Sequence, residues 1–145
     1  MSYELSVMED LVGKVVTGLE ISTDQMILVV SHDSGKSFYV TGSDCCSETW
    51  IADIVGVSNL IGQRVLKTEN VEVPYVDDGR CRQDVDEFYG VKLTTTRGYV
   101  DIVYRCSSNG NYGGALYLVE ESDTYVPYGT VAEADLIRIT DDFSA

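Results

Sequence analysis

The sequence predicts a β-rich α+β fold in which mostly antiparallel strands form a sheet, small barrel or sandwich, with only short helical turns. Short runs of β-branched and aromatic residues recur along the chain, which is typical of strands. Clusters of Gly, Asn, Asp and Ser separate these runs, as turns require. The length of 145 residues and the apolar fraction of 44% fit one domain, residues 1–145, that buries its own core.

Three runs near the start of the chain predict an antiparallel meander. Residues 14–22 and 26–31 are rich in Val, Ile and Leu, and the polar residues 22–25 separate them as a turn. The continuous apolar run 26–31 fits a strand that is buried on both faces. Residues 37–41 return after a hairpin at 33–36, where Gly can adopt a positive φ without steric cost.

The middle of the chain contains one ambiguous segment. Residues 48–55 place four large apolar side chains at helical spacing, but their pairing as Trp-Ile and Ile-Val suits a strand. We expect a further strand over 64–73, which Pro74 ends, and a polar, charged loop over 77–84.

The second half of the chain predicts a long hairpin and then shorter elements. Residues 88–96 and 99–106 flank Arg97-Gly98, a two-residue turn. The chain then continues with a Gly/Asn/Ser loop (107–114), a strand (115–120), a helical turn (132–136) and a last strand (137–140). In total we expect about seven or eight strands, and a frayed carboxyl end.

A weak internal repeat links two points where strands begin. Residues 10–16 (DLVGKVV) resemble residues 59–65 (NLIGQRV), and both read as a short turn, a glycine that ends it, and a strand. The similarity suggests a turn-and-strand unit present in two copies.

The charge of the chain narrows the classes of partner. Asp and Glu number 24 against 10 Lys and Arg, which gives a net charge of −14. Nucleic acids and anionic membranes repel such a surface, so we expect neither as a partner. No apolar stretch reaches the ~18 residues of a membrane-spanning helix, and the first residues carry no secretory signal pattern.

Half of the basic residues lie between positions 80 and 105, and two interpretations of them are open. Arg80, Arg82 and Arg105 could together bind a phosphate or carboxylate through paired guanidinium hydrogen bonds. They could equally neutralise the acidic residues at 77–87, which is the interpretation that we favour.

The four cysteines are Cys45, Cys46, Cys81 and Cys106, and we expect them to be reduced thiols buried in the core. A zinc site would need His32, the single histidine, together with three of these cysteines. No diagnostic ligand spacing supports such a site, so we predict no metal.

The sequence offers no motif of a nucleophile, a phosphate loop or a metal-dependent hydrolase, so we predict a protein without enzymatic activity or cofactor. Residues 110–114 are rich in glycine, but they lie between two strands, whereas phosphate loops precede a helix. A hairpin tip explains these glycines without a ligand.

Residues 43–54 (SDCCSETWIADI), together with 11–14, 60–62 and the late Ser-Asn-Gly-Asn-Tyr at 108–112, resemble a family of small bacteriophage proteins of unknown function. Members of that family carry an Asp-Cys-Cys-Glu core, an Ile-Glu-Asp-Ile segment and a Ser-Asn-Gly-Tyr-Tyr loop. A histidine commonly precedes their core, whereas Thr-Gly-Ser stands at 41–43 here, which argues against a metal site. The resemblance implies a phage origin and the host cytoplasm as location, but no chemistry.

These observations lead to three hypotheses of function. We favour an accessory phage protein that binds and inhibits or masks a host protein, one with a basic surface, in host takeover or anti-defence. The alternatives are a sponge for a small anionic ligand such as a nucleotide second messenger, and a structural or assembly protein of the virion. The sequence is also compatible with an oligomer. The candidate binding residues are Asp44, Cys45, Cys46, Trp50, Arg80, Arg82, Arg105, Asn109, Asn111 and Tyr112.

Overall fold

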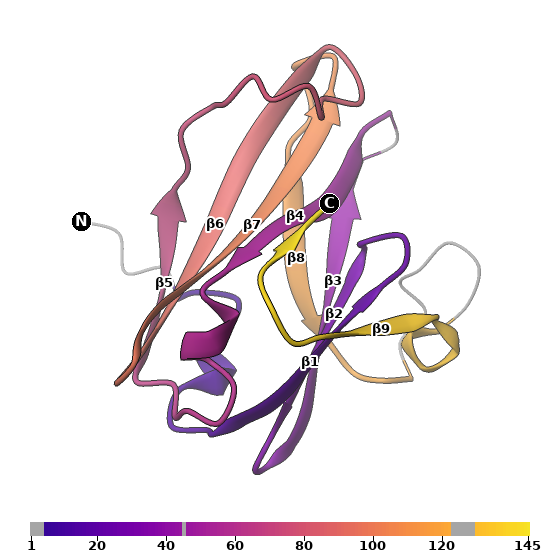
Figure 1. Cartoon of the computed structure of the whole chain (residues 1–145). Coiled ribbons are helices and arrows are strands. Elements are labelled where there is room, and N and C mark those ends of the chain that lie inside the picture. The colour runs from indigo at the N-terminus through magenta and orange to yellow at the C-terminus, as the bar shows by residue number, and fades with distance from the viewer. Residues whose placement is uncertain (1–4, 45, 123–129) are drawn as a thin grey trace.

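The computed structural model describes residues 5–44, 46–122 and 130–145, which form two five-stranded sheets packed face to face (Figure 1). Every strand pair in both sheets is antiparallel. Sheet 1 has the order β8 (Gly114–Val119), β3 (Gly35–Ser43), β2 (Ile27–His32), β1 (Val16–Ser22) and β9 (Leu136–Ile139). Sheet 2 has the order β10 (Phe143–Ser144), β4 (Glu48–Val55), β7 (Gly98–Ser108), β6 (Val85–Thr95) and β5 (Lys67–Glu72).

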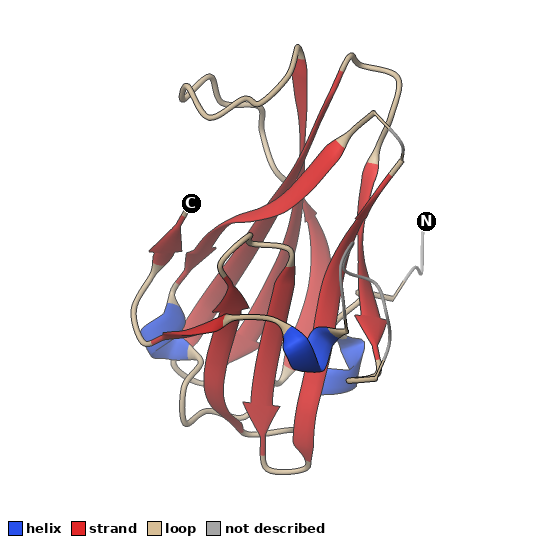
Figure 2. Ribbon diagram, turned by 90° about the vertical axis from the view of Figure 1, so that its right-hand side faces the viewer, coloured by secondary structure: helices blue, strands red, loops and turns tan. Residues whose placement is uncertain are grey.

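The prediction of a mostly antiparallel, sandwich-like fold is confirmed, and its helical part is small. In the described part of the chain the helical elements are single 3₁₀ turns, η1 (Glu9–Leu11), η2 (Val57–Asn59) and η3 (Val131–Glu133), all toward one end of the molecule (Figure 2). None of the helices described is long and apolar enough to cross a membrane. The strands number ten among the described residues, more than the seven or eight expected, because the ambiguous segment 48–55 forms β4 and the carboxyl end forms β10 where we predicted fraying.

The core lies between the sheets, and a second cluster lies on the outer face of sheet 1. Inward side chains such as Leu19, Val30, Ile54 and Ile102 pack in the main core. On the opposite face, Ile27, Val29 and Val40 are covered by Val131 of η3. Strand β2 is therefore buried on both faces, which explains its continuous apolar run.

The ambiguous segment 48–55 is strand β4. It pairs with β7 over its whole length, with one irregularity between Ile51 and Asp53, and five of its eight residues are buried. The helical spacing of its apolar residues is misleading because the irregularity shifts the alternation of the strand by one residue.

The two repeated segments lie side by side and are related by a local two-fold symmetry. Val15 pairs with its own counterpart, Arg64. The hydrogen bonds around this pair match: Gly13 N–H donates to the Val65 carbonyl (2.8 Å) and Gly62 N–H to the Val16 carbonyl (2.7 Å). Both glycines have positive φ, +85° and +83°, after a 3₁₀ turn. The repeat therefore marks the entry to β1 in sheet 1 and to β5 in sheet 2.

Candidate functional site

The structure brings four of the candidate residues together on the outer face of sheet 2. Strands β4 and β7 place Trp50 opposite Arg105, and the segment after β5, which runs along the top of the molecule in Figure 1, brings Arg80 and Arg82 to the same face. The Arg82 guanidinium lies 4.0 Å above the Trp50 ring, a cation–π contact. Arg82 also lies 3.7 Å from the Glu48 carboxylate.

Arg105 lies at the centre of this cluster and is almost completely buried. Its Nη1 donates to Asp78 (3.0 Å) and to the buried Asp86 (3.4 Å), and its guanidinium lies 4.2 Å from the Phe88 ring. Arg105 and, secondly, Arg80 hold the pKa of the Asp78 carboxyl well below its usual range. The carboxylate of Asp86 also accepts a hydrogen bond from the Ser107 hydroxyl.

Arg80 ties the segment after β5 to the carboxyl end of the chain. It donates twice to Asp53, at 3.1 and 3.0 Å, and also to Asp78. Its Nη1 donates to the Ser144 hydroxyl and the Ala145 carbonyl, both at 3.1 Å. The guanidinium groups of Arg80 and Arg105 are therefore occupied by the chain's own oxygens, and they hold the loop against sheet 2.

The other described candidate residues lie in turns and loops at the ends of the strands. Asp44 and Cys46 are exposed in the turn between β3 and β4, and Cys45 between them lies outside the described residues. In the loop after β7, Asn109 Oδ1 accepts the Asn111 N–H (3.1 Å), and the Tyr112 carbonyl accepts the Ser108 hydroxyl. These bonds close the loop on itself. The prediction of a hairpin tip is wrong, because β7 belongs to sheet 2 and β8 to sheet 1, so the loop connects the two sheets.

Two of the described cysteines differ from the expectation of buried thiols. Cys106 is buried, but Cys46 and Cys81 are exposed, because both lie in connections between strands and not on inward faces of strands. Within residues 5–44, 46–122 and 130–145, no three His, Cys, Asp or Glu side chains gather into a group suited to a metal ion.

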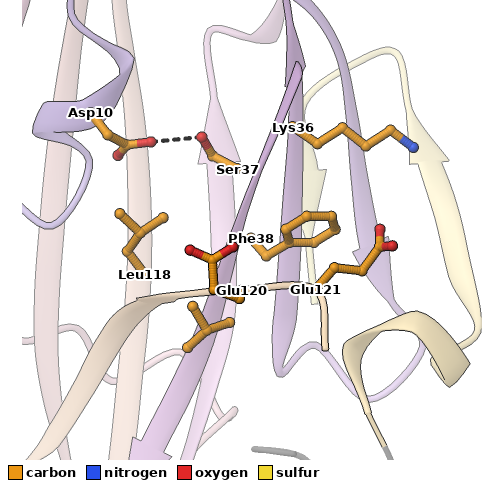
Figure 3. A pocket seen from close by; sticks show the side chains of 8 residues that line it. Asp10, Lys36, Ser37, Phe38, Leu118, Glu120 and Glu121 are labelled. Carbon is orange, nitrogen blue, oxygen red and sulfur yellow. Dashed lines mark hydrogen bonds between the residues drawn. The ribbon is translucent and has the colours of Figure 1, made fainter. Parts of the chain in front are cut away.

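A buried polar chain that the sequence analysis missed links η1 to the hairpin of β2 and β3. The Ser37 hydroxyl donates to Asp10 (2.6 Å), a bond drawn in Figure 3, and the Tyr39 hydroxyl donates to the same carboxylate (2.7 Å). His32 Nδ1 accepts the Ser34 N–H, so its Nε2 carries the proton and donates to Ser37 (3.0 Å). A serine, a histidine and an aspartate thus meet, but the histidine cannot accept the serine proton, so the chain is structural.

We expect this histidine to make the fold sensitive to mild acid. Burial, and then the charge of Lys14, lower the pKa of His32, while Asp10 and Asp33 oppose this shift. The unfolded chain therefore binds a proton near pH 6.5 that the folded chain binds only at lower pH. The free energy of unfolding should be constant above about pH 7.5 and should fall as the pH drops below about 6.5.

Urea unfolding at several pH values between 7.5 and 5.5 tests this expectation. The control is His32→Asn, whose amide can still donate and accept but does not titrate in this range. The loss of stability in this window should be smaller in the variant. An equal loss in both proteins would assign the pH dependence to the carboxylates alone.

Three hollows lie along strand β8, at the edge of sheet 1, and the sequence analysis did not find them. One of about 400 Å³ is lined by Asp10, Phe38, Leu118 and Glu121 among others (Figure 3). A second of about 550 Å³ lies between β8 and sheet 2, where Tyr89 and Tyr104 stack at 5.1 Å. A third of about 600 Å³ is lined by residues that include Asp44, Gly113 and Tyr117.

The sequence shows that β8 lacks protective residues, but it does not show that β8 lies at an edge. Residues 114–119 (GALYLV) contain no charged residue and no proline, although an edge strand usually carries one or the other. Their recognition as an edge depends on the sheet order, which the sequence alone does not reveal.

Comparison with known proteins places the chain in a family. Residues 9–118 match the model of a domain of unknown function (DUF7448), and this match covers about three quarters of the chain. It spans the strands from β1 to β7 and most of β8. Neither a curated protein nor a solved structure matches the chain. The chain therefore belongs to the DUF7448 family of domains of unknown function.

Proposed function

We propose that this chain is a binding protein without enzymatic activity and that it engages a partner protein through its acidic surface. More specifically, we propose that it is a bacteriophage accessory protein that binds a basic protein of the bacterial host and inhibits or masks it. The resemblance of residues 43–54 to small phage proteins supports that origin, and the net charge of −14 supports a basic partner.

One observation carries the proposal: the arginines best placed to bind an anion are already occupied. Arg80 and Arg105 donate to Asp53, Asp78 and Asp86, which are the carboxylates of their own chain. A nucleotide would have to displace these carboxylates, and Arg105 would first have to leave a nearly dry environment. The geometry therefore favours a basic protein over a small anionic ligand.

The test is capture from a bacterial lysate on the immobilised chain, with a charge control. The control changes six exposed carboxylates to amides and so lowers the net charge from −14 to −8 (−14 + 6). Its substitutions are Glu72→Gln, Glu120→Gln, Glu121→Gln, Asp77→Asn, Asp84→Asn and Asp141→Asn. We expect the parent chain to retain basic proteins that elute by about 0.5 M salt, because the Debye length is then only a few ångströms.

The control should retain roughly tenfold less of the same proteins. Equal capture by both baits, or no capture by either, would contradict the proposal. Thermal unfolding of the chain in the presence of a panel of nucleotides tests the alternative function, a nucleotide sponge. A ligand at about 100 times its Kd stabilises by about 2.7 kcal/mol, and such a rise in Tm would favour a nucleotide sponge.

A further inference from the structure

Strand β8 is an edge strand without the features that usually protect such an edge. It pairs with β3 alone, in an uninterrupted register from Gly114 to Val119. It has no charge, proline or bulge, while Tyr117 and Leu118 are 49% and 48% exposed. Natural proteins rarely leave a flat apolar edge open, because it pairs with other strands.

The direction of the backbone groups shows which residues are available on this edge. The Thr41 N–H donates to the Met26 carbonyl (2.9 Å), so the backbone of Thr41 faces β2. Its neighbour across the β3–β8 ladder, Leu116, must therefore face away from β3. By the same alternation Gly114 and Leu118 also face outward, and Gly114 N–H indeed donates to the Tyr89 hydroxyl (3.2 Å).

The outward groups of Leu116 and Leu118 thus form the part of the edge that a further strand could use. The ladder to β3 is formed by the alternate residues Ala115, Tyr117 and Val119. Among the described residues, no hydrogen bond is found on the outward N–H groups of Leu116 and Leu118. An added strand would find two donors and two acceptors here.

The three hollows flank this edge and would receive the side chains of such a strand. The hollow at the carboxyl end of β8 is lined by Leu118 and Val119, the one facing sheet 2 by Leu116, and the third by Ala115 and Tyr117. Side chains of an added strand point alternately to the two sides of the sheet. The hollows lie on both sides, so both sets of side chains have space.

The charges at the end of β8 indicate the chemistry of the partner. Asp10, Glu120 and Glu121 line the hollow at its carboxyl end, against a single lysine, Lys36 (Figure 3). Glu72 lines the neighbouring hollow. A segment with lysine or arginine at this end would be attracted, whereas a second copy of this chain would bring another net charge of −14.

We infer that β8 is a docking edge that adds one extended strand of a partner protein, antiparallel to β8, with apolar side chains and with basic residues at its amino-terminal end. Antiparallel addition continues the pattern of sheet 1 and places the amino end of the new strand beside Glu120 and Glu121. The inference rests on the proposed function in that it names the surface which holds the basic partner.

A synthetic peptide provides a defined probe. It consists of two lysines followed by six alternating threonines and valines. Backbone NMR of the intact chain should show the amide protons of Leu116 and Leu118 protected by this peptide, with little change in exchange at Ala115 and Tyr117, which are already bonded to β3. A peptide with two glutamates in place of the lysines, and one with the lysines at its carboxyl end, should each bind at least about tenfold more weakly.

Two variants at one position separate backbone pairing from side-chain contact. Leu118→Pro removes an outward N–H and leaves the β3 ladder intact, since proline is tolerated on the open side of an edge strand. Leu118→Ala shortens the side chain but keeps the N–H. We expect the proline variant to bind the peptide about tenfold more weakly than the parent chain. The alanine variant should bind it no more than about threefold more weakly.

Two triple variants of equal net charge test the position of the charges. Glu72→Gln/Glu120→Gln/Glu121→Gln neutralises acids that line two of the hollows along β8, and Asp77→Asn/Asp84→Asn/Asp141→Asn neutralises exposed acids elsewhere. Binding of the lysine peptide should fall in the first and be nearly unchanged in the second. Equal effects would mean that the overall charge, not this edge, attracts the peptide.

The outcomes distinguish this inference from the proposed function. Absence of peptide binding, or equal binding of the lysine and glutamate peptides, overturns the docking edge even where the lysate still provides basic partners. If the amide protons of Leu116 and Leu118 become protected when the protein concentration is raised without peptide, the edge pairs with a second copy of the chain. That result also overturns the inference. If the proline variant unfolds, the protection of the Leu116 and Leu118 amide protons in the parent chain is the test of backbone pairing.

Discussion

Replacing Arg105 with methionine is expected to lower the free energy of unfolding by about 3–5 kcal/mol, the cost typical of breaking a buried ion pair. The side chains of Arg105 and Asp86 are each 2% exposed. Removal of the guanidinium would leave the Asp86 carboxylate buried with a hydroxyl partner, Ser107, but no cation. Urea unfolding monitored by the fluorescence of Trp50, which lies opposite Arg105, measures the change.

The double variant Arg105→Met/Asp86→Asn is the control for this prediction. An asparagine can still accept the Ser107 hydroxyl but carries no charge to compensate. The Nε of Arg105 has no hydrogen-bond partner among the described residues, so the native guanidinium buries one donor without an acceptor. We therefore expect the double variant to recover more than half of the stability lost. A loss below about 1 kcal/mol in the single variant would mean that the ion pairs of Arg105 contribute little to stability.

Replacing Gly56 with alanine is expected to be nearly as damaging, while the same change at Gly62 should be mild. Both residues have positive φ, +90° and +83°. A left-handed backbone costs an L-residue about 1–2 kcal/mol. At Gly56 a Cβ would also lie 2.3 Å from the Tyr99 carbonyl oxygen, whereas at Gly62 nothing lies within 4 Å.

The two alanine variants therefore separate backbone strain from lack of space. We expect a loss of about 1–2 kcal/mol for Gly62→Ala and of about 2–5 kcal/mol for Gly56→Ala, where overpacking adds to the strain. Thermal unfolding measures both, and each kcal/mol corresponds to about 2–4 °C in Tm for a chain of this size. Equal losses in the two variants would show that the contact with Tyr99 relaxes without cost.

Local patterns in the sequence were sufficient to predict most strands. The runs at 26–31 and 99–106 became β2 and most of β7, because alternation and turn residues are local properties. Strand β10 was missed, since Phe143 and Ser144 form a strand only through their pairing with β4. The start of β5 at Lys67, later than expected, has the same origin, since residues 64 and 65 pair with the entry to β1 instead.

The candidate site depends on contacts between distant parts of the chain, and local patterns predict only part of it. Arg80, Arg82 and Arg105 do gather, as their proximity in sequence suggested, and internal carboxylates bind two of them strongly. The hydrogen bond from Ser37 to Asp10 joins residues 27 positions apart in sequence, so no local pattern predicts it. The open edge of β8 likewise follows from the order of the strands.

The most direct test of a basic partner held at β8 is hydrogen–deuterium exchange of the intact chain, free and in a salt-sensitive complex recovered from lysate. We predict slower exchange on complex formation at Leu116 and Leu118, together with a partner whose mass is unchanged. Slower exchange confined to the loop before β6, or a partner that has been cleaved or chemically modified, would contradict the account.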